Sequence, residues 1–418
     1  MVEGGALARE TAETVARHSY GKLVAFLAAR SGDVAAAEDA LSEAFASAID
    51  TWPRTGMPQN PEAWLLTAAR RKAIDALRRR RRDDGAAEHL QLIADELASA
   101  ESHGMPDERL ALMFACAHPA IDPGIRAPLI LQTVLGFDAA AIASAFLVAP
   151  ATMSQRLVRA KAKIRNAGIP FRVPGREELR ERLDAVLDAI YAAYAEGWSD
   201  PEGTDSRCRN LAEEGLWLGR LVASLLPDEP EALGLLALML HAESRREARR
   251  NAKGGFVPLA DQDVGLWNAS TIDEAEALLR RAGSMKIIGR YQLEAAVQSA
   301  HAVRRLSGRA DWAAILSLYD ALWQMTRSPV VAINRAVALA ETAGAAAGLA
   351  ALDELAEDAR LAQYQPYWAA RAELLARNDR TAEARLAYEC AIGLEVDPAL
   401  RAFLQGRLSA VGRLPPRG

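Results

Sequence analysis

The stretch from Phe137 to Arg165 constrains the fold more than any other part of this chain, because it predicts two helices joined by a sharp break. Asp138 can cap a short helix whose apolar residues recur at helical spacing. Residues 147–150 end that helix, since the residue before Pro150 disfavours the α conformation. A second helix then begins near position 151. This is the pattern of a helix-turn-helix, whose second helix enters the major groove of DNA.

The second of these helices has an apolar face and a polar, cationic face. Met153, Leu157, Ala160 and Ile164 recur every three or four residues, so we expect them to face the core. Small polar side chains near the start of such a helix can reach base edges, and cations further along can reach phosphates. The predicted DNA contacts are Thr152, Ser154, Gln155, Arg156, Arg159 and Lys163.

Composition favours helices along the whole chain. Half of the 418 residues are apolar and only 6% are aromatic, while helix-forming Ala, Leu, Arg and Glu abound. We therefore expect an all-α fold. The net charge of −5 is unusual for a DNA-binding protein, but it is unevenly spread: residues 70–82 alone carry +7. Local rather than total charge governs phosphate binding.

Several classes of protein are disfavoured by what the sequence lacks. Cys116, Cys208 and Cys390 are far apart, which fits a reducing cytosol rather than a disulfide framework. The chain shows neither a signal-peptide run nor an apolar stretch that could span a bilayer, so we expect a cytoplasmic protein without membrane contact. We find no pattern typical of a metal site, a cofactor site or a catalytic nucleophile, and expect no enzymatic activity.

The N-terminal part, residues 9–82, reads as one helical domain. The helix predicted around residues 33–52 has an apolar stripe of Leu41, Phe45 and Ile49 and a separate acidic face. A turn-rich loop follows. The next helix is capped by Asn60, and its C-terminal end carries the positive charge.

The rest of the chain contains a linker and two further domains. Residues 83–105 are acidic and read as the linker, and residues 106–168 form the helix-turn-helix domain. Residues 176–418 read as stacked helix pairs. The clearest unit is PYWAARAELLARNDRTAEARLAYECAIGLEVDP, which matches a tetratricopeptide (TPR) repeat, although the spacing is irregular, as in a divergent solenoid.

Two of these segments, in this order, resemble a known family. AAAEDALSEAFASAIDTWP followed by NPEAWLLTAARRKAIDALRRRRR is similar to region 2 of bacterial RNA polymerase sigma factors of the extracytoplasmic-function (ECF) group, within the sigma-70 family. LILQTVLGFDAAAIASAFLVAPATMSQRLVRAKAKIRNAGIPF resembles their region 4. GLLALMLHAESRREAR and SPVVAINRAVALA resemble the ECF subgroup with a TPR-like C-terminal extension. That extension opens with a motif close to YLIFNEGY, of which Ala189–Asp200 keeps only the Glu-Gly.

The resemblance implies two partners, core RNA polymerase and promoter DNA, with the acidic linker threading a basic channel of the polymerase. It assigns the helix-turn-helix residues named above to the −35 element. Polymerase contacts are expected from Glu38, Asp39, Ser42, Glu43 and Phe45. Contacts with the −10 element are expected from Trp52, Asn60, Trp64, Arg70, Lys72, Arg78 and Arg79.

The leading hypothesis is an alternative sigma factor whose C-terminal helical domain regulates its activity and has a protein or peptide partner. The alternative is a stand-alone helix-turn-helix regulator whose TPR-like domain senses a ligand or peptide. A third hypothesis is a scaffold with vestigial DNA-binding parts. The first domain favours the sigma factor, because a stand-alone regulator has no need of it.

Overall fold

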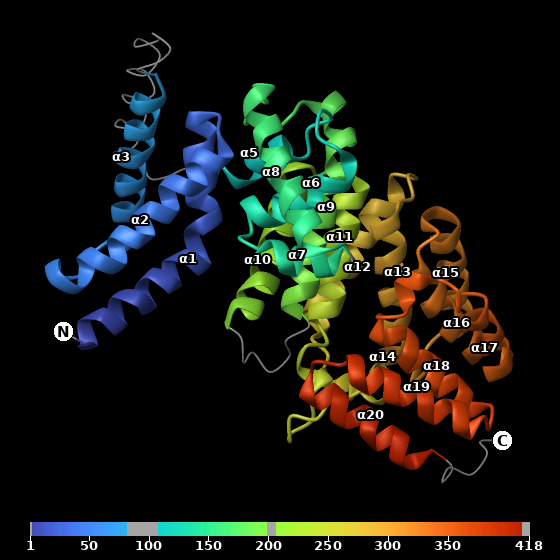
Figure 1. Ribbon diagram of the computed structural model, residues 1–418. Coiled ribbons are helices and arrows are strands. Elements are labelled where there is room, and N and C mark those ends of the chain that lie inside the picture. Colours follow the sequence, from blue (N-terminus) through green and yellow to red (C-terminus); the bar gives the residue numbers. More distant parts are fainter. Residues whose placement is uncertain (1, 82–107, 147, 199–205, 412–418) are drawn as a thin grey trace. The chain divides into compact units, whose positions relative to one another are not determined.

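The computed structural model describes residues 2–81, 108–146, 148–198 and 206–411, and the chain divides into two compact units (Figure 1). Unit 1 comprises residues 1–197 with 210–212, and unit 2 comprises residues 198–209 and 213–418. Throughout the described ranges the regular elements are helices, apart from an isolated β-bridge between Arg250 and Phe256. The all-α class expected from the composition is confirmed.

Unit 1 begins with three helices that pack against one another: α1 (Val2–Ser31), α2 (Val34–Thr55) and α3 (Pro61–Arg81). Their shared core includes Phe26, Trp52 and other fully buried large side chains. The burial of these apolar faces, more than helix propensity, holds such helices together.

The predicted stripe on α2 is only partly right. Leu41 is fully buried and Phe45 is half-buried, but Ile49 is 40% exposed. The buried face instead continues through Ala44 and Ala48 to Trp52, again at steps of three or four residues. The prediction chose Ile49 because it is larger and more apolar than the alanines next to it. The buried face is formed by those smaller residues instead.

Side-chain caps define where α2 and α3 begin. The Asp33 carboxylate accepts a hydrogen bond from the backbone N–H of Ala36 (3.1 Å), and Asn60 Oδ1 accepts one from the N–H of Ala63 (3.0 Å). The predicted cap at Asn60 is thereby confirmed. Gly56 ends α2 with a φ of 84°, a conformation that glycine adopts readily.

Four further helices form the second half of unit 1: α5 (Arg109–Cys116), α6 (Pro123–Thr133), α7 (Ala139–Ala145) and α8 (Pro150–Asn166). Asp138 caps α7 by accepting hydrogen bonds from two backbone N–H groups, and α8 starts at Pro150, as expected. The predicted core face of α8 is confirmed, because Met153, Leu157, Ala160 and Ile164 are all buried.

One more helix, α9 (Arg176–Trp198), also belongs mainly to unit 1. The buried Arg126 of α6 ties it in place: its guanidinium donates to the carbonyl oxygens of Ile121 and Pro119 within its own segment and to that of Glu181 in α9. Because a buried guanidinium is costly unless its donors are paired, this arrangement favours a fixed position for α9.

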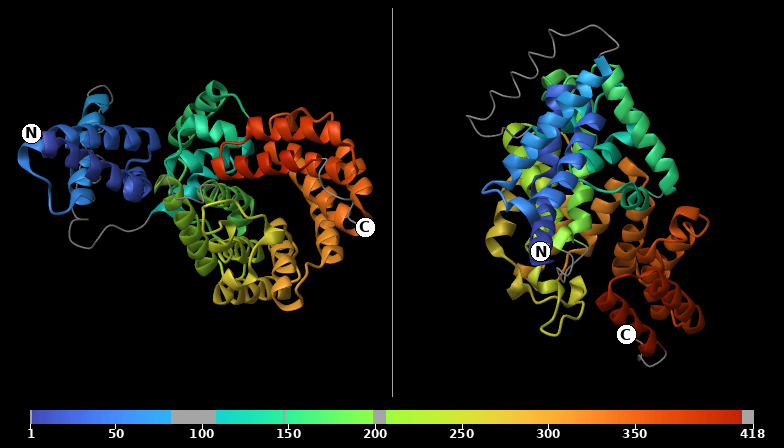
Figure 2. Two further views of the ribbon diagram at one scale, coloured as in Figure 1. Left: turned by 90° about the horizontal axis from the view of Figure 1, so that it is seen from below. Right: turned by 60° about the vertical axis from the view of Figure 1, so that its left-hand side comes forward.

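Unit 2 is a succession of helices, and from α11 to α20 most of them pack on helices next to them in the chain (Figures 1 and 2). Short 3-10 turns occur at η2 (Glu247–Arg249), η3 (Leu259–Asp261), η4 (Val264–Leu266) and η5 (Ala359–Leu361). The α-helices are α10 (Ser206–Leu225), α11 (Pro230–Glu243), α12 (Ala269–Ser284), α13 (Arg290–Ala302), α14 (Arg304–Ser307), α15 (Trp312–Thr326), α16 (Pro329–Ala343), α17 (Ala345–Asp353), α18 (Gln365–Arg377), α19 (Thr381–Leu394) and α20 (Pro398–Ala410).

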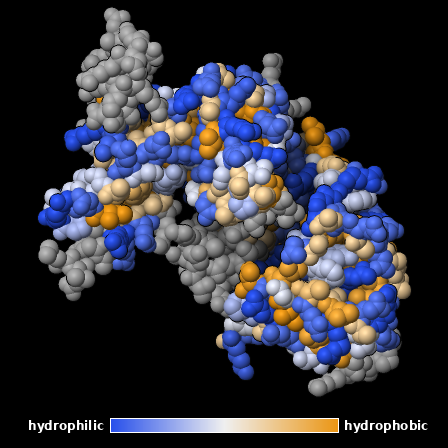
Figure 3. All heavy atoms as spheres, in the orientation of Figure 1, coloured by the Kyte–Doolittle hydropathy of each residue, from blue (hydrophilic) through white to orange (hydrophobic). Residues whose placement is uncertain are grey.

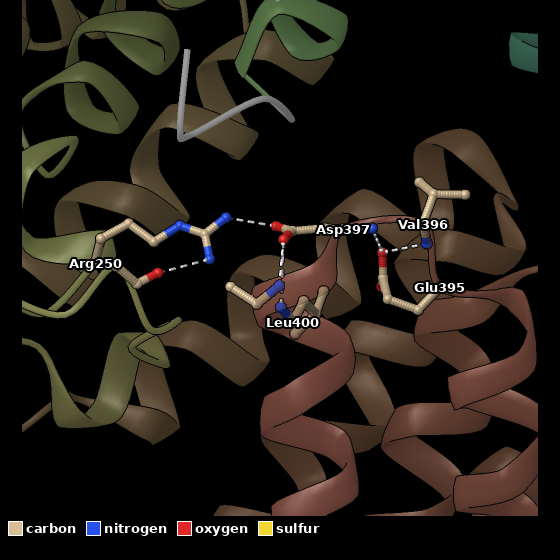
Figure 4. Close-up of polar contacts among 7 residues, drawn as sticks. Arg250, Glu395, Val396, Asp397 and Leu400 are labelled. Atoms are coloured by element: carbon tan, nitrogen blue, oxygen red, sulfur yellow. Dashed lines mark hydrogen bonds and ion pairs between the residues drawn. The ribbon is translucent and has the colours of Figure 1, made fainter. Parts of the chain in front are cut away.

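The succession curves back on itself, so that a loop early in unit 2 meets its last helix. Arg250 pairs with Asp397 at the start of α20, with 2.6 Å between guanidinium and carboxylate (Figure 4). The rings of Phe256 and Phe403 pack edge to face, 5.4 Å apart. In Figure 2 the yellow loop and the red terminal helices accordingly lie close together.

Polar side chains cover most of the face shown in Figure 3, with apolar residues gathered over the C-terminal helices. Leu386 of α19 and Val396, just before α20, are 64% and 86% exposed. Scattered apolar residues are normal on a protein surface.

Candidate functional site

The acidic face predicted on α2 is divided between two environments. Asp39, Ser42 and Glu43 are exposed, and Phe45 is half-buried beside them. Glu43 pairs with Lys72 of α3 at 3.2 Å, and each of these side chains is about half exposed. An exposed pair of this kind adds little stability, so these residues of α2 remain accessible to a partner.

Glu38 is covered, because Lys161 of α8 lies against it. The ammonium and the carboxylate are 2.5 Å apart, and only 12% of the lysine side chain and 15% of the glutamate side chain are exposed. Burial raises the pKa of Glu38, while the charge of Lys161 opposes that rise. The structure thus places a residue predicted to bind polymerase in an ion pair with the helix predicted to bind DNA.

Other contacts join the same two parts of unit 1. Arg165 of α8 lies 3.5 Å from the carboxylate of Asp33, the residue that caps α2. Gly21 of α1 lies so close to the turn after α6 that a Cβ at this position would be 1.8 Å from the carbonyl oxygen of Val134. Burial and the charge of Glu38 raise the pKa of the neighbouring Tyr20. Helices α1 and α2 therefore pack directly against α5, α6 and α8.

The loop between α2 and α3 and the first turn of α3 hold two of the predicted −10 contacts in exposed or half-buried positions. Asn60 is exposed, with its side chain engaged as the cap of α3, and Trp64 is half-buried. Trp52 is only 1% exposed and packs edge to face on Trp64, with 5.5 Å between ring centroids. In this structure Trp52 is a core residue that supports Trp64, and we leave it out of the proposed DNA contacts.

The basic residues of α3 also differ from one another. Arg70 is buried and lies over the ring of Phe26, 4.9 Å from its centroid. We therefore leave Arg70, too, out of the proposed DNA contacts. Lys72 is exposed, whereas the side chains of Arg78 and Arg79 lie outside the described residues, as does the linker at 83–105.

The outward face of α8 carries every predicted −35 contact. Thr152, Ser154, Gln155, Arg156, Arg159 and Lys163 are all exposed. The helix contains five cations and no acidic residue between Pro150 and Asn166. Val158 lies on the same outward side and is 68% exposed.

Sequence reasoning missed three residues of this region. Val158 was overlooked because only polar side chains of α8 were considered as DNA contacts, although it lies about 100° around the helix from Leu157 and so outside the buried face. The contact role of Lys161 could have been found, since it follows Leu157 by four residues and therefore borders the buried face. Gly21 gave no signal, because its role depends on the approach of a distant turn.

Among the described residues, no group of three or more His, Cys, Asp or Glu side chains is arranged to hold a metal ion. None of the described helices is both long and apolar enough to cross a membrane.

Comparisons with known proteins agree with the architecture. Residues 15–83, which cover most of α1 and the whole of α2 and α3, match the model for sigma-70 region 2. Residues 182–283 match a family of unknown function, DUF6596. The chain is 38% identical over 388 residues to an uncharacterized protein of Rhizobium meliloti (strain 1021), covering 91% of this chain and 90% of the relative. No solved structure matches the chain.

The match indicates a class of protein: the packed helices at the start of unit 1 are similar to region 2 of sigma factors, the subunits through which RNA polymerase begins transcription. The chain therefore carries a segment similar to region 2 of the sigma-70 family. It also shares a family with the Rhizobium protein, across both of its units.

Proposed function

We propose that this protein is an alternative sigma factor of the ECF type, which binds core RNA polymerase and directs it to particular promoters. The observation that carries the proposal is the region 2 match over α1–α3. A stand-alone DNA-binding regulator has no use for such a domain, so the match favours the sigma factor over that alternative.

Core polymerase binds the exposed part of α2 in this proposal. Asp39, Ser42 and Glu43 form an accessible polar surface, and Phe45 adds a half-buried apolar contact next to it. Glu38 belongs to the same surface but becomes available only when Lys161 leaves it. Acidic side chains on a helix face suit a basic partner surface.

Promoter DNA contacts two separate helices. Residues 139–166 act as the helix-turn-helix, with Arg156 and its exposed neighbours on α8 reading the −35 element. The absence of acidic residues from α8 supports this role, because carboxylates would repel phosphates. Asn60, Trp64, Lys72, Arg78 and Arg79 are the proposed −10 contacts, since an aromatic ring with polar and cationic groups near it can hold an unstacked base.

Val158 extends the proposed −35 surface. An exposed valine beside Gln155 and Arg159 offers methyl groups where a recognition helix approaches base edges. In the major groove, the methyl group of thymine is the apolar feature that distinguishes one base from the others. Val158 therefore contacts a thymine of the −35 element in this proposal.

The C-terminal part regulates these activities without catalysing a reaction. Its paired helices, such as α16 with α17 and α18 with α19, support a TPR-like solenoid that binds a protein or peptide. We propose functional domains at residues 9–82, 106–168 and 176–418, and a cytoplasmic protein that meets polymerase and DNA there.

Binding to core polymerase tests the proposal. The full chain should bind purified core enzyme, and the double substitution Asp39→Ala and Glu43→Ala should weaken binding at least about tenfold, in the range expected for interface hot spots. Glu10→Ala, an exposed acidic position on α1, is the matched control. A chain that binds promoter DNA but not core enzyme would instead be a stand-alone regulator.

A further inference from the structure

We propose that the ion pair of Lys161 and Glu38 acts as a latch, which holds the −10-reading helices (α1–α3) and the −35-reading helices (α5–α8) of unit 1 together. Core polymerase opens this latch by binding Glu38 in place of Lys161. This inference rests on the proposed function. Its structural basis is the contact between α2 and α8, where a cation of the DNA-binding helix occupies a residue of the polymerase-binding surface.

The contact has the features of a specific interface. Lys161 and Glu38 are both mostly removed from solvent, and a charge in such a place is costly without its partner. A second pair, Arg165 with Asp33, lies on the same side of α8. Gly21 permits the backbone of α1 to approach Val134 more closely than any other residue type would. Two ion pairs and a close backbone approach thus converge on one interface.

The latched arrangement cannot read both promoter elements at once. Thr152 is nine residues from Lys161, about 14 Å along a helix, and the end of α2 at Thr55 is 17 residues from Glu38, about 26 Å. With about 10 Å added between the packed helix axes, the end of α2 and the start of α8 lie within about 50 Å of each other. Elements centred near −10 and −35 are separated by about 25 base pairs, or about 85 Å of duplex.

The chain is long enough to unlatch without unfolding either part. Twenty-seven residues separate Arg81, at the end of α3, from Arg109, at the start of α5. Fully extended, they reach at most about 95 Å, which slightly exceeds the distance between the two elements. Opening the latch therefore both uncovers Glu38 and permits the spacing that a promoter requires.

Zero-length crosslinking of the full chain tests the latch directly. A carbodiimide joins a lysine amine to a carboxylate in contact with it, as an amide, with loss of water. The free protein should yield a Glu38–Lys161 crosslink, identified by peptide mass spectrometry, and core polymerase should suppress it. The Lys22–Glu62 pair (3.6 Å) lies entirely within α1 and α3, so its crosslink should persist and serves as the internal control.

Promoter-specific initiation should require that the latch can open. Protein carrying the Glu38–Lys161 crosslink should lose promoter-specific initiation, while Lys161→Met protein treated in the same way controls for other modification. Untreated Lys161→Met should bind core enzyme about tenfold more tightly than the wild type, because Lys161 no longer competes with core enzyme for Glu38. Gly21→Ala should act in the same direction from the opposite side of the interface, and alanine is the better helix former, so α1 itself is preserved.

The outcomes separate the latch from the proposed function. A free protein that forms the Lys22–Glu62 crosslink but not the Glu38–Lys161 crosslink has no latch. Undiminished initiation by the crosslinked protein would also overturn the inference, as would unchanged core affinity in both Lys161→Met and Gly21→Ala. Failure of the unmodified protein to initiate would contradict the proposed function instead, whatever the crosslinks show.

Discussion

Replacing Asp397 tests whether an ion pair closes unit 2 on itself. Its side chain has two roles (Figure 4): Oδ1 accepts hydrogen bonds from the backbone N–H groups of Ala399 (2.8 Å) and Leu400 (3.4 Å), which caps α20, and Oδ2 pairs with Arg250. Asp397→Asn keeps an oxygen for the cap and removes the charge. Asp397→Ala removes both, so the two variants separate the roles.

The magnitudes follow from burial. The side chains of Arg250 and Asp397 are 11% and 18% exposed, so loss of the carboxylate leaves a guanidinium mostly out of water. Breaking a fully buried pair costs about 3–5 kcal/mol, and partial exposure reduces this to about 2–3 kcal/mol for Asp397→Asn. Loss of the cap adds about 1 kcal/mol in Asp397→Ala.

Hydrogen exchange measured on the α20 peptide is the direct assay. Where exchange follows the opening equilibrium, Asp397→Asn should accelerate it by about 30- to 150-fold, and Asp397→Ala by a further fivefold or so. Arg250→Ala should match Asp397→Asn, and the double variant should add little. If the α20 peptide of Asp397→Asn exchanged at the wild-type rate, the ion pair would not stabilise the closure of unit 2. Helix α20 would then be held by its cap and apolar packing alone.

Three further predictions concern unit 2 and the DNA-binding helix. Burial lowers the pKa of His241 to about 4, with Arg245 contributing. Because the unfolded chain then binds more protons, this residue alone should lower the stability by about 3 kcal/mol as the pH drops from 6.5 towards 4, and His241→Asn should remove that part of the pH dependence in acid denaturation. Arg156→Ala should reduce −35-dependent initiation at least about fivefold in run-off transcription without changing the affinity for core enzyme. A reduced affinity for core enzyme would contradict the assignment of Arg156 to the −35 element. Uracil in place of a −35 thymine should weaken initiation about fourfold for the wild type but not for Val158→Ala, and equal sensitivity of both proteins would exclude the methyl contact.

Much of the fold was predictable because local signals agree with one another. Asp138, Asn60 and Pro150 mark helix starts that the structure confirms, and the core face of α8 follows from a simple repeat. Ile49 shows where such reasoning fails: an apolar side chain at helical spacing was placed in the core, but alanines on the neighbouring flank fill it. Periodicity alone does not decide between two adjacent flanks of one helix.

The candidate site was less predictable, because its key contacts join residues far apart in the sequence. Glu38 and Lys161 are 123 positions apart, and each looks like an ordinary surface charge in its own helix. Trp52 and Arg70 matched the pattern of DNA contacts, yet packing against Trp64 and Phe26 buries them. Sequence patterns identify residue types that suit DNA, whereas tertiary packing decides which of them reach the surface.

Transcription reconstituted from purified core RNA polymerase and genomic DNA, with start sites mapped in the presence and absence of this protein, tests the central claim most directly. A sigma factor should produce new start sites that share sequence elements near −10 and −35 and that appear only when the protein is added. Arg156→Ala should reduce these same starts. An unchanged set of start sites, with the protein folded and in excess over core enzyme, would contradict the account.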